Sequence, residues 1–209
     1  MMSDSSAGAG RQPHYFTTPP PGAPRRTRTV TLAGQDVDVV TSDGVFSSDR
    51  VDLGTRVLLR EVPDPPPDGD LLDLGCGWGP LAISLALRSP GATVWAVDVN
   101  ERALELTREN AARLRLTGLR AVLPDDVPAE IGFAAIWSNP PIRIGKPELH
   151  RLLLRWLPRL TPAGSAYLVV QRHLGADSLH AWLQAELGEP FVVGRLGSAK
   201  GYRVLHVHR

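Results

Sequence analysis

The chain has 209 residues, of which 43% are hydrophobic and 22% are charged, and this is the composition of an ordinary globular protein. Its single cysteine, Cys76, excludes an internal disulfide and, by itself, a thiolate metal site. The first ten residues lack the basic start and apolar centre of a signal peptide, and no apolar run approaches the roughly 18 residues of a membrane span. We therefore expect a cytoplasmic protein with no metal ion and no membrane partner.

The net charge of +1 hides an uneven distribution along the chain. Residues 142–209 hold ten Lys and Arg against four Asp and Glu, so the remainder of the chain is acidic. A basic region of this kind is expected of a protein that binds nucleic acid, although an ordinary solvated surface has the same composition. Charge alone leaves both interpretations open.

The N-terminal part of the chain differs in composition from the rest. It is rich in Ser, Gly and Pro, which is typical of disorder. The predicted organisation is a disordered tail (1–27) and one domain (28–209), which has an N-terminal extension (28–62) and a core (70–209). In the extension, β-branched residues around Ala33-Gly34-Gln35 predict a hairpin over 28–41, and apolar residues at helical spacing predict a helix over 49–61. Four prolines between residues 63 and 67 then end that helix.

Strand and helix patterns alternate through the core. Short apolar runs predict strands at 71–74, 93–97, 134–137, 166–170, 191–194 and 202–207. Helical spacing predicts a helix ending at Leu87 and further helices over 101–116, 147–157 and 178–187. Strands joined by helical crossovers form a parallel sheet with right-handed connections. The predicted fold class is therefore α/β, a doubly wound, Rossmann-like sheet of seven mostly parallel strands with an antiparallel C-terminal edge strand.

The strongest motif joins the first core strand to a glycine-rich turn and a helix. It reads Leu-Asp-Leu-Gly-Cys-Gly-Trp-Gly-Pro from Leu72 to Pro80. Glycines at 75, 77 and 79 let the backbone turn sharply and approach a ligand. Dinucleotide-binding folds use the spacing G-x-G-x-x-G to place a pyrophosphate at the helix N-terminus, whereas the spacing here is G-x-G-x-G. This spacing favours a ligand without a pyrophosphate.

A second acid ends the next predicted strand. Asp98 follows Val97 and lies 19 residues beyond Gly79, where a carboxylate can accept hydrogen bonds from both hydroxyls of a ribose. The alternative role for Asp98 is to cap the helix that follows, but Asn100 is the better cap candidate. Asp73 also has a structural alternative, because a carboxylate at a strand end can tie down the glycine-rich turn.

A third motif, Asn139-Pro140-Pro141-Ile142, follows the predicted strand 134–137. An exocyclic or amide nitrogen is a poor nucleophile because its lone pair is delocalised into the attached π system. The side-chain oxygen of Asn139 and the carbonyl of Pro140 can accept its two N–H groups and so align the lone pair for direct displacement. Two successive prolines fix the direction of the carbonyls and add no competing donor. The motif therefore predicts group transfer to a nitrogen.

Together these motifs resemble those of class I S-adenosylmethionine-dependent methyltransferases, over most of the chain from about Asp43 to Arg209. In that family the acid at the position of Asp73 lies near the methionine moiety, Asp98 holds the ribose, and Asp125 or Asp126 would contact the adenine amine. A surface turn is the alternative for Asp125 and Asp126. The cofactor-binding residues that the resemblance implies are Phe46, Thr55, Asp73, Gly75, Cys76, Gly77, Gly79, Asp98, Val99, Asp125, Asp126 and Asn139. The catalytic residues that it implies are Asn139, Pro140, Pro141 and Ile142.

Residues outside the three motifs restrict the resemblance to one group of methyltransferases. Ile142 stands where many amino methyltransferases have an aromatic residue, and Gly145-Lys146 follows it. This pattern looks like the small single-domain relatives of the ribosomal small-subunit guanine-N2 methyltransferases, the RsmC type. Three further segments match that family, namely Gly44-Val45-Phe46-Ser47, Asp52-x-Gly54-Thr55 and Lys200-Gly201-Tyr202-Arg203. The resemblance implies methylation of guanine N2 in ribosomal RNA or a small-subunit particle, with Arg143 and Lys146 beside the acceptor pocket as candidate phosphate contacts. The oligomeric state stays open between a monomer and a homodimer.

Three other functions use part of the same pattern. A protein-glutamine N-methyltransferase shares the Asn-Pro-Pro chemistry, but Ile142 and the short N-terminal region count against it. A small-molecule N-methyltransferase would leave the basic region without a purpose. A catalytically silent module that binds the cofactor or RNA would not need the intact Asn139-Pro140-Pro141.

Overall fold

The computed structural model describes residues 24–45 and 50–209. The predicted cofactor residue Phe46 lies outside the described residues, so its role stays a prediction. Strand β1 (Arg25–Leu32) pairs antiparallel with β2 (Gln35–Ser42), which confirms the hairpin. The pairing begins at Arg25, so residues 25–27 belong to the strand and not to the predicted tail. Both turn residues have positive φ, 50° at Ala33 and 77° at Gly34, as a two-residue hairpin turn of type I′ requires.

Seven strands form the main sheet, in the order β5-β4-β3-β6-β7-β9-β8. They are β3 (Asp70–Leu74), β4 (Thr93–Val97), β5 (Leu119–Val122), β6 (Phe133–Ser138), β7 (Leu160–Gln171), β8 (Val192–Ala199) and β9 (Tyr202–His208). Strands β3 to β7 pair in parallel, and β9 runs antiparallel to both β7 and β8. The predicted fold class is confirmed, although the last strand, β9, inserts between β7 and β8, so that β8 forms the outer edge. No range is predicted from the sequence for β5, which has only 4 residues.

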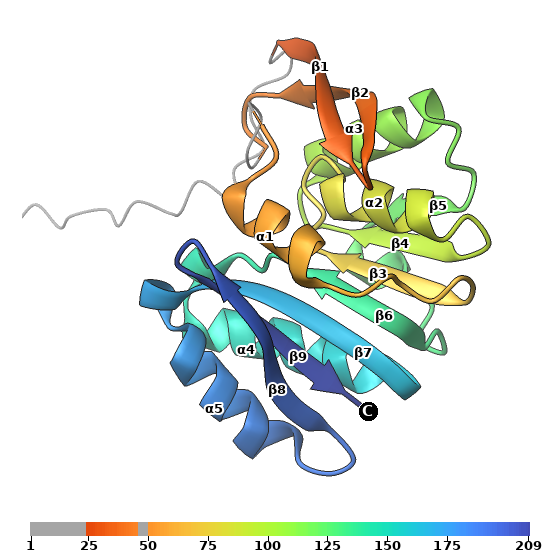
Figure 1. Cartoon of the computed structure of the whole chain (residues 1–209). Coiled ribbons are helices and arrows are strands. Elements are labelled where there is room, and N and C mark those ends of the chain that lie inside the picture. The colour runs from red at the N-terminus through yellow and green to blue at the C-terminus, as the bar shows by residue number, and fades with distance from the viewer. Residues whose placement is uncertain (1–23, 46–49) are drawn as a thin grey trace, which may run out of the picture.

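Within residues 24–45 and 50–209, five α-helices cover the two faces of this sheet (Figure 1). They are α1 (Leu53–Glu61), α2 (Pro80–Arg88), α3 (Glu101–Arg113), α4 (Lys146–Trp156) and α5 (Ala176–Leu187). Helices α1, α2 and α3 share one face, where Leu58, Leu85 and Leu104 belong to one apolar core cluster. Helices α4 and α5 share the other face, where Leu153 and Leu183 belong to a second cluster. No helix among the described residues is both long and apolar enough to span a bilayer.

Two helix ends differ from the predicted boundaries for local reasons. Helix α1 begins at Leu53 and not at residue 49, because the Asp52 carboxylate accepts the first free N–H groups of the helix, from Gly54 and Thr55. Helix α3 ends at Arg113 and not at residue 116, since Arg115 adopts a φ of 57°, which no α-helix continues through.

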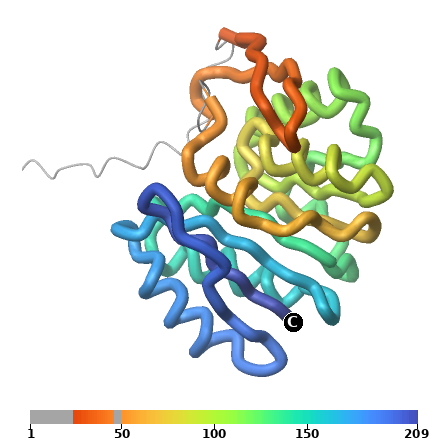
Figure 2. Tube along the Cα trace, in the orientation of Figure 1, coloured from red at the N-terminus to blue at the C-terminus, as the bar shows by residue number. Residues whose placement is uncertain are grey.

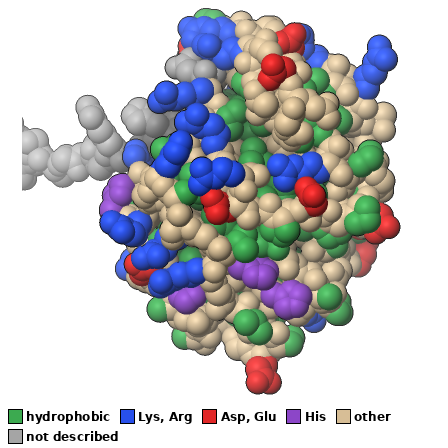
Figure 3. Space-filling model, in the orientation of Figure 1, with side chains coloured by type: hydrophobic (Ala, Val, Ile, Leu, Met, Phe, Trp, Pro, Cys, Tyr) green, Lys and Arg blue, Asp and Glu red, His purple; other side chains and the backbone are tan. Residues whose placement is uncertain are grey.

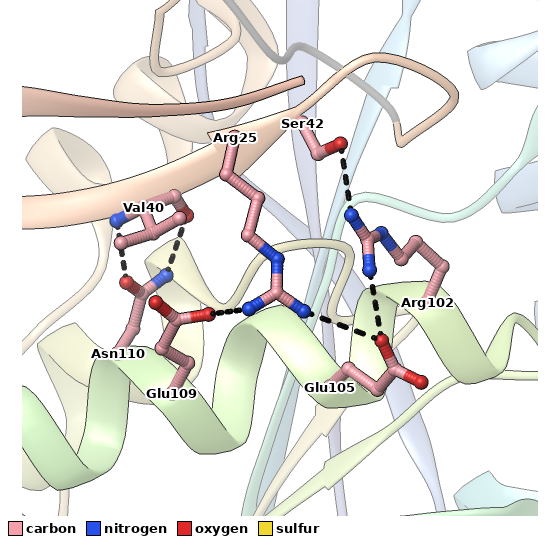
Figure 4. A network of polar contacts seen from close by, with 7 residues as sticks. All are labelled: Arg25, Val40, Ser42, Arg102, Glu105, Glu109 and Asn110. Atoms are coloured by element: carbon pink, nitrogen blue, oxygen red, sulfur yellow. Dashed lines mark hydrogen bonds and ion pairs between the residues drawn. The ribbon is translucent and has the colours of Figure 1, made fainter. Parts of the chain in front are cut away.

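The N-terminal hairpin lies beside α3 (Figure 2), and polar side chains join the two (Figure 4). The buried amide of Asn110 accepts the N–H of Val40 at 2.6 Å and donates to the carbonyl of Val40 at 3.0 Å, so it pairs with β2 as a third strand would. Asn110 also donates to the carbonyl of Trp78 in the glycine-rich turn, at 3.1 Å. On β1, Arg25 forms an ion pair with Glu109 at 2.9 Å. The hairpin is thereby joined to the turn that carries the first motif.

Candidate functional site

A cavity of about 590 Å³ opens at the carboxyl ends of the parallel strands β3, β4, β6 and β7, near the start of α1. Its walls include the segment after β2, the glycine-rich turn, the starts of α1 and α2, the loops after β4, β5, β6 and β7, and the start of β9. Open α/β sheets bind ligands outside the carboxyl ends of their strands. The volume is within the range of about 300–1,000 Å³ that is usual for small-molecule sites.

The glycine-rich turn is held against the end of β4 by its main chain. The N–H groups of Gly75 and Cys76 donate to the carbonyl of Val97 at 2.8 and 3.0 Å, and the N–H of Gly77 donates to Asp98 at 2.9 Å. Gly75 and Gly77 have φ values of 80° and 57°, in the left-handed region that favours glycine. The turn therefore brings its backbone to the cavity wall beside Asp98.

Gly79 has a different structural role from Gly75 and Gly77. It does not line the cavity but precedes α2, with a φ of 97°. A Cβ at this position would lie 3.0 Å from a methyl group of Thr107 on α3. The third glycine of the motif thus permits the close approach of α2 and α3, and its predicted cofactor role stays a prediction.

Asp98 lies half-buried in the cavity wall. Its two carboxylate oxygens accept the N–H groups of Asn100 and Gly77, both at 2.9 Å. The side chain of Asn100 caps α3 by accepting the N–H of Arg102 at 3.0 Å, which confirms the expected cap and leaves Asp98 free of that task. Burial raises the pKa of Asp98 above its ordinary value. Each oxygen retains a lone pair for a ligand hydroxyl.

Asp73 is fully buried at the end of β3 and also lines the cavity. One oxygen, Oδ2, accepts the N–H of Ala82 in the first turn of α2 at 2.8 Å. Asp73 therefore has a structural role in holding the segment that follows the glycine-rich turn. The other oxygen, Oδ1, is buried and has no partner among the residues that the structure describes. Burial, with a smaller contribution from the charge on Asp98, raises the pKa of Asp73 to about 8. An unsatisfied buried carboxyl oxygen is costly unless a ligand donates to it.

Cys76 is buried within the turn, and its sulfur lies 3.7 Å from the hydroxyl of Thr107. Burial raises the pKa of the thiol well above its ordinary value, so the thiolate that a nucleophile requires is disfavoured. Among the described residues, no group of three or more His, Cys, Asp and Glu side chains could hold a metal ion.

On the other side of β3 from Asp98, the end of β6 presents Asn139 with a fixed orientation. Its side-chain nitrogen donates to the Asp52 carboxylate at 2.9 Å and to the Thr55 hydroxyl at 3.2 Å. A carboxylate only accepts, so the nitrogen of the amide must be the atom that faces Asp52. The amide oxygen of Asn139 is left without a partner among the described residues and is the acceptor that this side chain can offer to a ligand.

Pro140 and Pro141 form a tight turn directly after Asn139. Pro141 has φ −73° and ψ 74°, and the N–H of Ile142 donates to the carbonyl of Pro140 at 2.8 Å, which is an inverse γ-turn. The carbonyl of Pro140 therefore has one lone pair engaged and a second one free. Ile142 lies half-buried in the cavity wall.

A buried hydroxyl ties the two sides of the cavity together. Ser138, the last residue of β6, donates to the carbonyl of Leu74, the last residue of β3, at 2.7 Å. The glycine-rich turn and the Asn-Pro-Pro turn begin one residue beyond these two positions, so this bond fixes where one turn lies relative to the other.

Several cavity residues are absent from the sites predicted from sequence, and Asp52, Gln171 and Tyr202 are polar examples. They come from α1, β7 and β9, and Tyr202 packs so closely on Gly54 that a Cβ there would lie 2.9 Å from both its ring and the Asp52 carboxylate. Tyr202 stands in a segment that matches the resembled family, and Asp52 stands at a helix start, but neither feature by itself indicates a cavity.

The structure places some of the predicted site residues in the cavity wall and others outside it. Thr55, Asp73, Gly75, Cys76, Gly77, Asp98, Val99, Asn139, Pro140, Pro141, Ile142 and Arg143 line the one cavity. Asp125, Asp126 and Lys146 are not in its wall, which includes Pro124 instead. Asp125 is exposed and forms an ion pair with Arg155 at 2.8 Å. The adenine contact predicted for Asp125 or Asp126 stays a prediction.

Comparison with known proteins assigns the family. A model of the methyltransferase small domain family matches residues 36–206. The chain belongs to this family. The predicted class I S-adenosylmethionine-dependent methyltransferase of RsmC type is thereby confirmed, and this family member is an enzyme that uses S-adenosylmethionine.

Several relatives share this domain. The uncharacterized protein YbxB of Bacillus subtilis is 34% identical over 196 residues, which cover 92% of this chain and 96% of that protein. Ribosomal RNA small subunit methyltransferase C of Pseudomonas aeruginosa is 37% identical over 160 residues, covering 69% of this chain and 47% of that protein. The fold also matches the 16S rRNA N2 G1207 methyltransferase of Thermus thermophilus, solved with AdoMet and guanosine, with a TM-score of 0.76 at 24% identity over 91% of this chain and 52% of that one. The chain thus spans about half the length of the relatives named as RNA methyltransferases.

Proposed function

We propose that this family member transfers a methyl group from S-adenosylmethionine to the exocyclic N2 of a guanine in ribosomal RNA. The observation that carries the proposal is the orientation of Asn139. Its nitrogen is held by Asp52 and Thr55, so its oxygen is available at the cavity wall as a hydrogen-bond acceptor. An acceptor in this position suits a substrate with N–H groups.

The cofactor side of the cavity fits S-adenosylmethionine. The free lone pairs of Asp98 suit the two ribose hydroxyls, and the unpartnered Oδ1 of Asp73 suits the ammonium group of the methionine moiety. The main chain of Gly75, Cys76 and Gly77 supplies a wall without bulky side chains. When bound, the cofactor supplies an electrophilic methyl group on a sulfonium, which is a good leaving group.

The acceptor side then has to localise a lone pair. The oxygen of Asn139 accepts one N–H of the exocyclic amine, and the free lone pair of the Pro140 carbonyl accepts the other. With both N–H groups engaged, the lone pair of the nitrogen is left free to accept the methyl group. With the cofactor held by Asp73 and Asp98, its sulfonium would supply the methyl group to this nitrogen, and the proton that the nitrogen gives up would leave to solvent. No side chain with a strongly shifted pKa is required as a base at this turn.

Guanine in ribosomal RNA is favoured by the relatives named above and by the basic character of residues 142–209. Arg143 lies in the cavity wall and Lys146 begins α4 nearby, and both are exposed. This substrate would place the reaction in the cytoplasm. Ile142 offers the acceptor an aliphatic surface, which also accommodates a base but stacks less strongly than an aromatic ring.

The test is transfer of labelled methyl from S-adenosylmethionine to ribosomal RNA, 30S particles and total protein from cells that lack this gene. We expect label in RNA that digests to N2-methylguanosine. In the Asn139→Ala variant the rate should fall by about 10²–10³-fold, as for loss of one preorganised hydrogen bond in an active site, while cofactor affinity stays within about threefold. Gln184→Ala, which removes an amide side chain of α5 outside the cavity wall, is the control and should retain transfer.

Other outcomes would contradict the proposal in distinct ways. Label found only in protein would move the acceptor to a glutamine amide. Transfer to neither RNA nor protein, with tight cofactor binding, would leave a small-molecule acceptor or a silent module. An Asn139→Ala variant as active as the parent would remove Asn139 from the mechanism.

A further inference from the structure

The Lys and Arg side chains of this chain fall into two groups according to their partners. Over most of the described surface they are paired with acids or carbonyls. Arg25 with Glu109, Arg155 with Asp125 and Arg203 with Asp177 are examples, at 2.9, 2.8 and 2.8 Å. Arg108 and Arg159 instead donate to main-chain carbonyls, at 2.8 and 3.0 Å. Such side chains have their hydrogen-bonding capacity partly occupied.

A smaller group is exposed and has no ion pair, hydrogen bond or ring contact among the described residues. Six of its members line the cavity or stand within two residues of a lining residue, and we call them the mouth cations. They are Arg50, Arg56, Arg143, Lys146, Arg172 and Lys200. The other two, Arg113 and Arg115, lie at the end of α3, next to the start of β5 at the opposite edge of the sheet.

The fold places the mouth cations around the acceptor side from four separate segments. Arg56 is next to the cavity residue Thr55 in the first turn of α1. Arg172 lies directly after the cavity residue Gln171 at the end of β7, and its N–H donates to the carbonyl of Gly201 at 2.8 Å. That bond brings Arg172 beside the β8–β9 turn, which carries Lys200. Figure 3 shows Lys and Arg side chains gathered over this part of the molecule, with few acidic side chains among them.

The cofactor side of the same opening has the opposite charge. The exposed acids Glu101 and Asp126 follow β4 and β5, and Asp98 lies in the wall there. A polyanion at the opening is therefore attracted by the acceptor side and repelled by the cofactor side. The charge distribution has the right sense to guide a nucleic acid toward Asn139 and away from the bound cofactor.

We infer that the mouth cations bind the phosphates of the RNA nucleotides on either side of the methylated guanine. This inference rests on the proposed function. A base must leave its stack to reach Asn139, which costs a few kcal/mol, and contacts to the flanking phosphates offset that cost. Unpaired guanidinium groups suit this task, because their planar forks match phosphate oxygens and no internal ion pair has to be broken first.

The salt dependence of RNA binding tests the inference with a matched pair of variants. One is Arg56→Gln/Arg172→Gln at the mouth, and the other is Arg113→Gln/Arg115→Gln at the far edge. Each removes two exposed, unpaired arginines and the same charge. Binding of a fluorescent 16S rRNA fragment is measured by anisotropy between about 50 and 300 mM salt, with cofactor affinity measured in parallel.

We expect the slope of log K against log salt to become shallower by about 1.5 in the mouth variant, from about 0.7–0.9 per lost phosphate contact. The far-edge variant should keep the parent slope, and both should keep the parent cofactor affinity. Equal slopes in the two variants, or no RNA binding by the parent, would overturn the inference.

The same measurements separate this inference from the proposed function. RNA that is bound with the expected slopes but receives no methyl group would contradict the proposed acceptor and leave the surface standing. If RNA is methylated at N2 but the two variants have equal slopes, the proposed acceptor stands and the inferred RNA-binding surface is contradicted. Equal affinity for a double-stranded DNA of the same length would overturn the assignment of the surface to RNA.

Discussion

The cofactor side and the acceptor side of the cavity are held by different kinds of bonds. On the cofactor side, the glycine-rich turn is fixed by main-chain donors to Val97 and Asp98, from the next strand along the chain. On the acceptor side, Asn139 is fixed by the side chains of Asp52 and Thr55, which are 87 and 84 residues away in sequence. The first arrangement depends on backbone conformation and the second on side chains that meet only in the folded protein.

This difference predicts that the two sides can be damaged separately. Changes on the cofactor side should alter the affinity for S-adenosylmethionine, whereas changes on the acceptor side should alter turnover at saturating cofactor. Ser138 is the exception, because its bond to Leu74 joins the two sides. The variants below test this separation.

Asp98→Ala should have the largest effect, and it should be on cofactor affinity. We expect the Kd for S-adenosylmethionine to rise by about 100-fold or more, since two hydrogen bonds to a charged group at about 1.5 kcal/mol each are lost. Isothermal titration calorimetry measures the change. Asp36→Ala, which removes an exposed carboxylate of β2 outside the cavity wall, is the comparison and should bind within about threefold of the parent.

Gly54→Ala should damage the acceptor side alone. The new Cβ would lie 2.9 Å from both the Asp52 carboxylate and the Tyr202 ring, so the clamp on Asn139 has to shift. We expect kcat to fall by about 10- to 100-fold, as displacement of a positioning group by about 1 Å does, with little change in cofactor affinity.

The matched control for that substitution is Gly194→Ala on β8, where a Cβ meets no atom within 4 Å. This variant should keep the parent kcat. An equal loss of turnover in both variants, or a loss of cofactor affinity in Gly54→Ala, would show that the two sides are not separable at this point.

Asp73 should make cofactor binding depend on pH. Its pKa of about 8 means that the free protein holds a proton there at neutral pH, and a cationic ammonium group beside Oδ1 would expel it. Affinity for S-adenosylmethionine should therefore rise as the pH rises toward 8, by up to about tenfold per unit from this group. The Asp73→Asn variant lacks the effect. The amino group of the cofactor contributes equally to the pH profiles of the parent and of Asp73→Asn. The difference between these two profiles therefore reports the titration of Asp73.

The same group affects the stability of the free protein with a definite sign. The folded state keeps a proton that the unfolded chain gives up above its ordinary pKa of 3.8. The free energy of unfolding should therefore fall between about pH 4 and 8 in the parent relative to Asp73→Asn, as the linkage relation requires. Parallel pH profiles in urea would contradict the shifted pKa.

Ser138→Ala should have the smallest effect, and it should appear on both sides. Loss of one buried hydrogen bond costs about 1 kcal/mol of the free energy of unfolding, which is about 2–4 °C in Tm for a chain of this size. Both the Kd and kcat should change by a few-fold. The exposed Ser178, which donates to the carbonyl of Gly175 at 3.0 Å, is the control, and Ser178→Ala should leave all three quantities unchanged.

The sequence by itself determined the features that depend on neighbouring residues. The alternation of short apolar runs with helical patterns predicted the parallel sheet, because the periodicity of each element is written in its own residues. The glycine-rich turn was recognisable for the same reason, because glycine is favoured at the positive φ values of Gly75 and Gly77. Asn100 was identifiable as a helix cap because it directly precedes α3. Both motifs at the cavity therefore come from contiguous residues.

Tertiary structure alone decided which side chains meet. Asp52 caps a helix and also orients Asn139, and only the packing of α1 against the end of β6 creates the second role. Asp125 has the residue type expected for a cofactor contact, but it forms an ion pair with Arg155 on α4. Whether a given arginine is paired or free is settled in the same way, since the direction of an exposed side chain and its partner depend on segments that are distant in sequence.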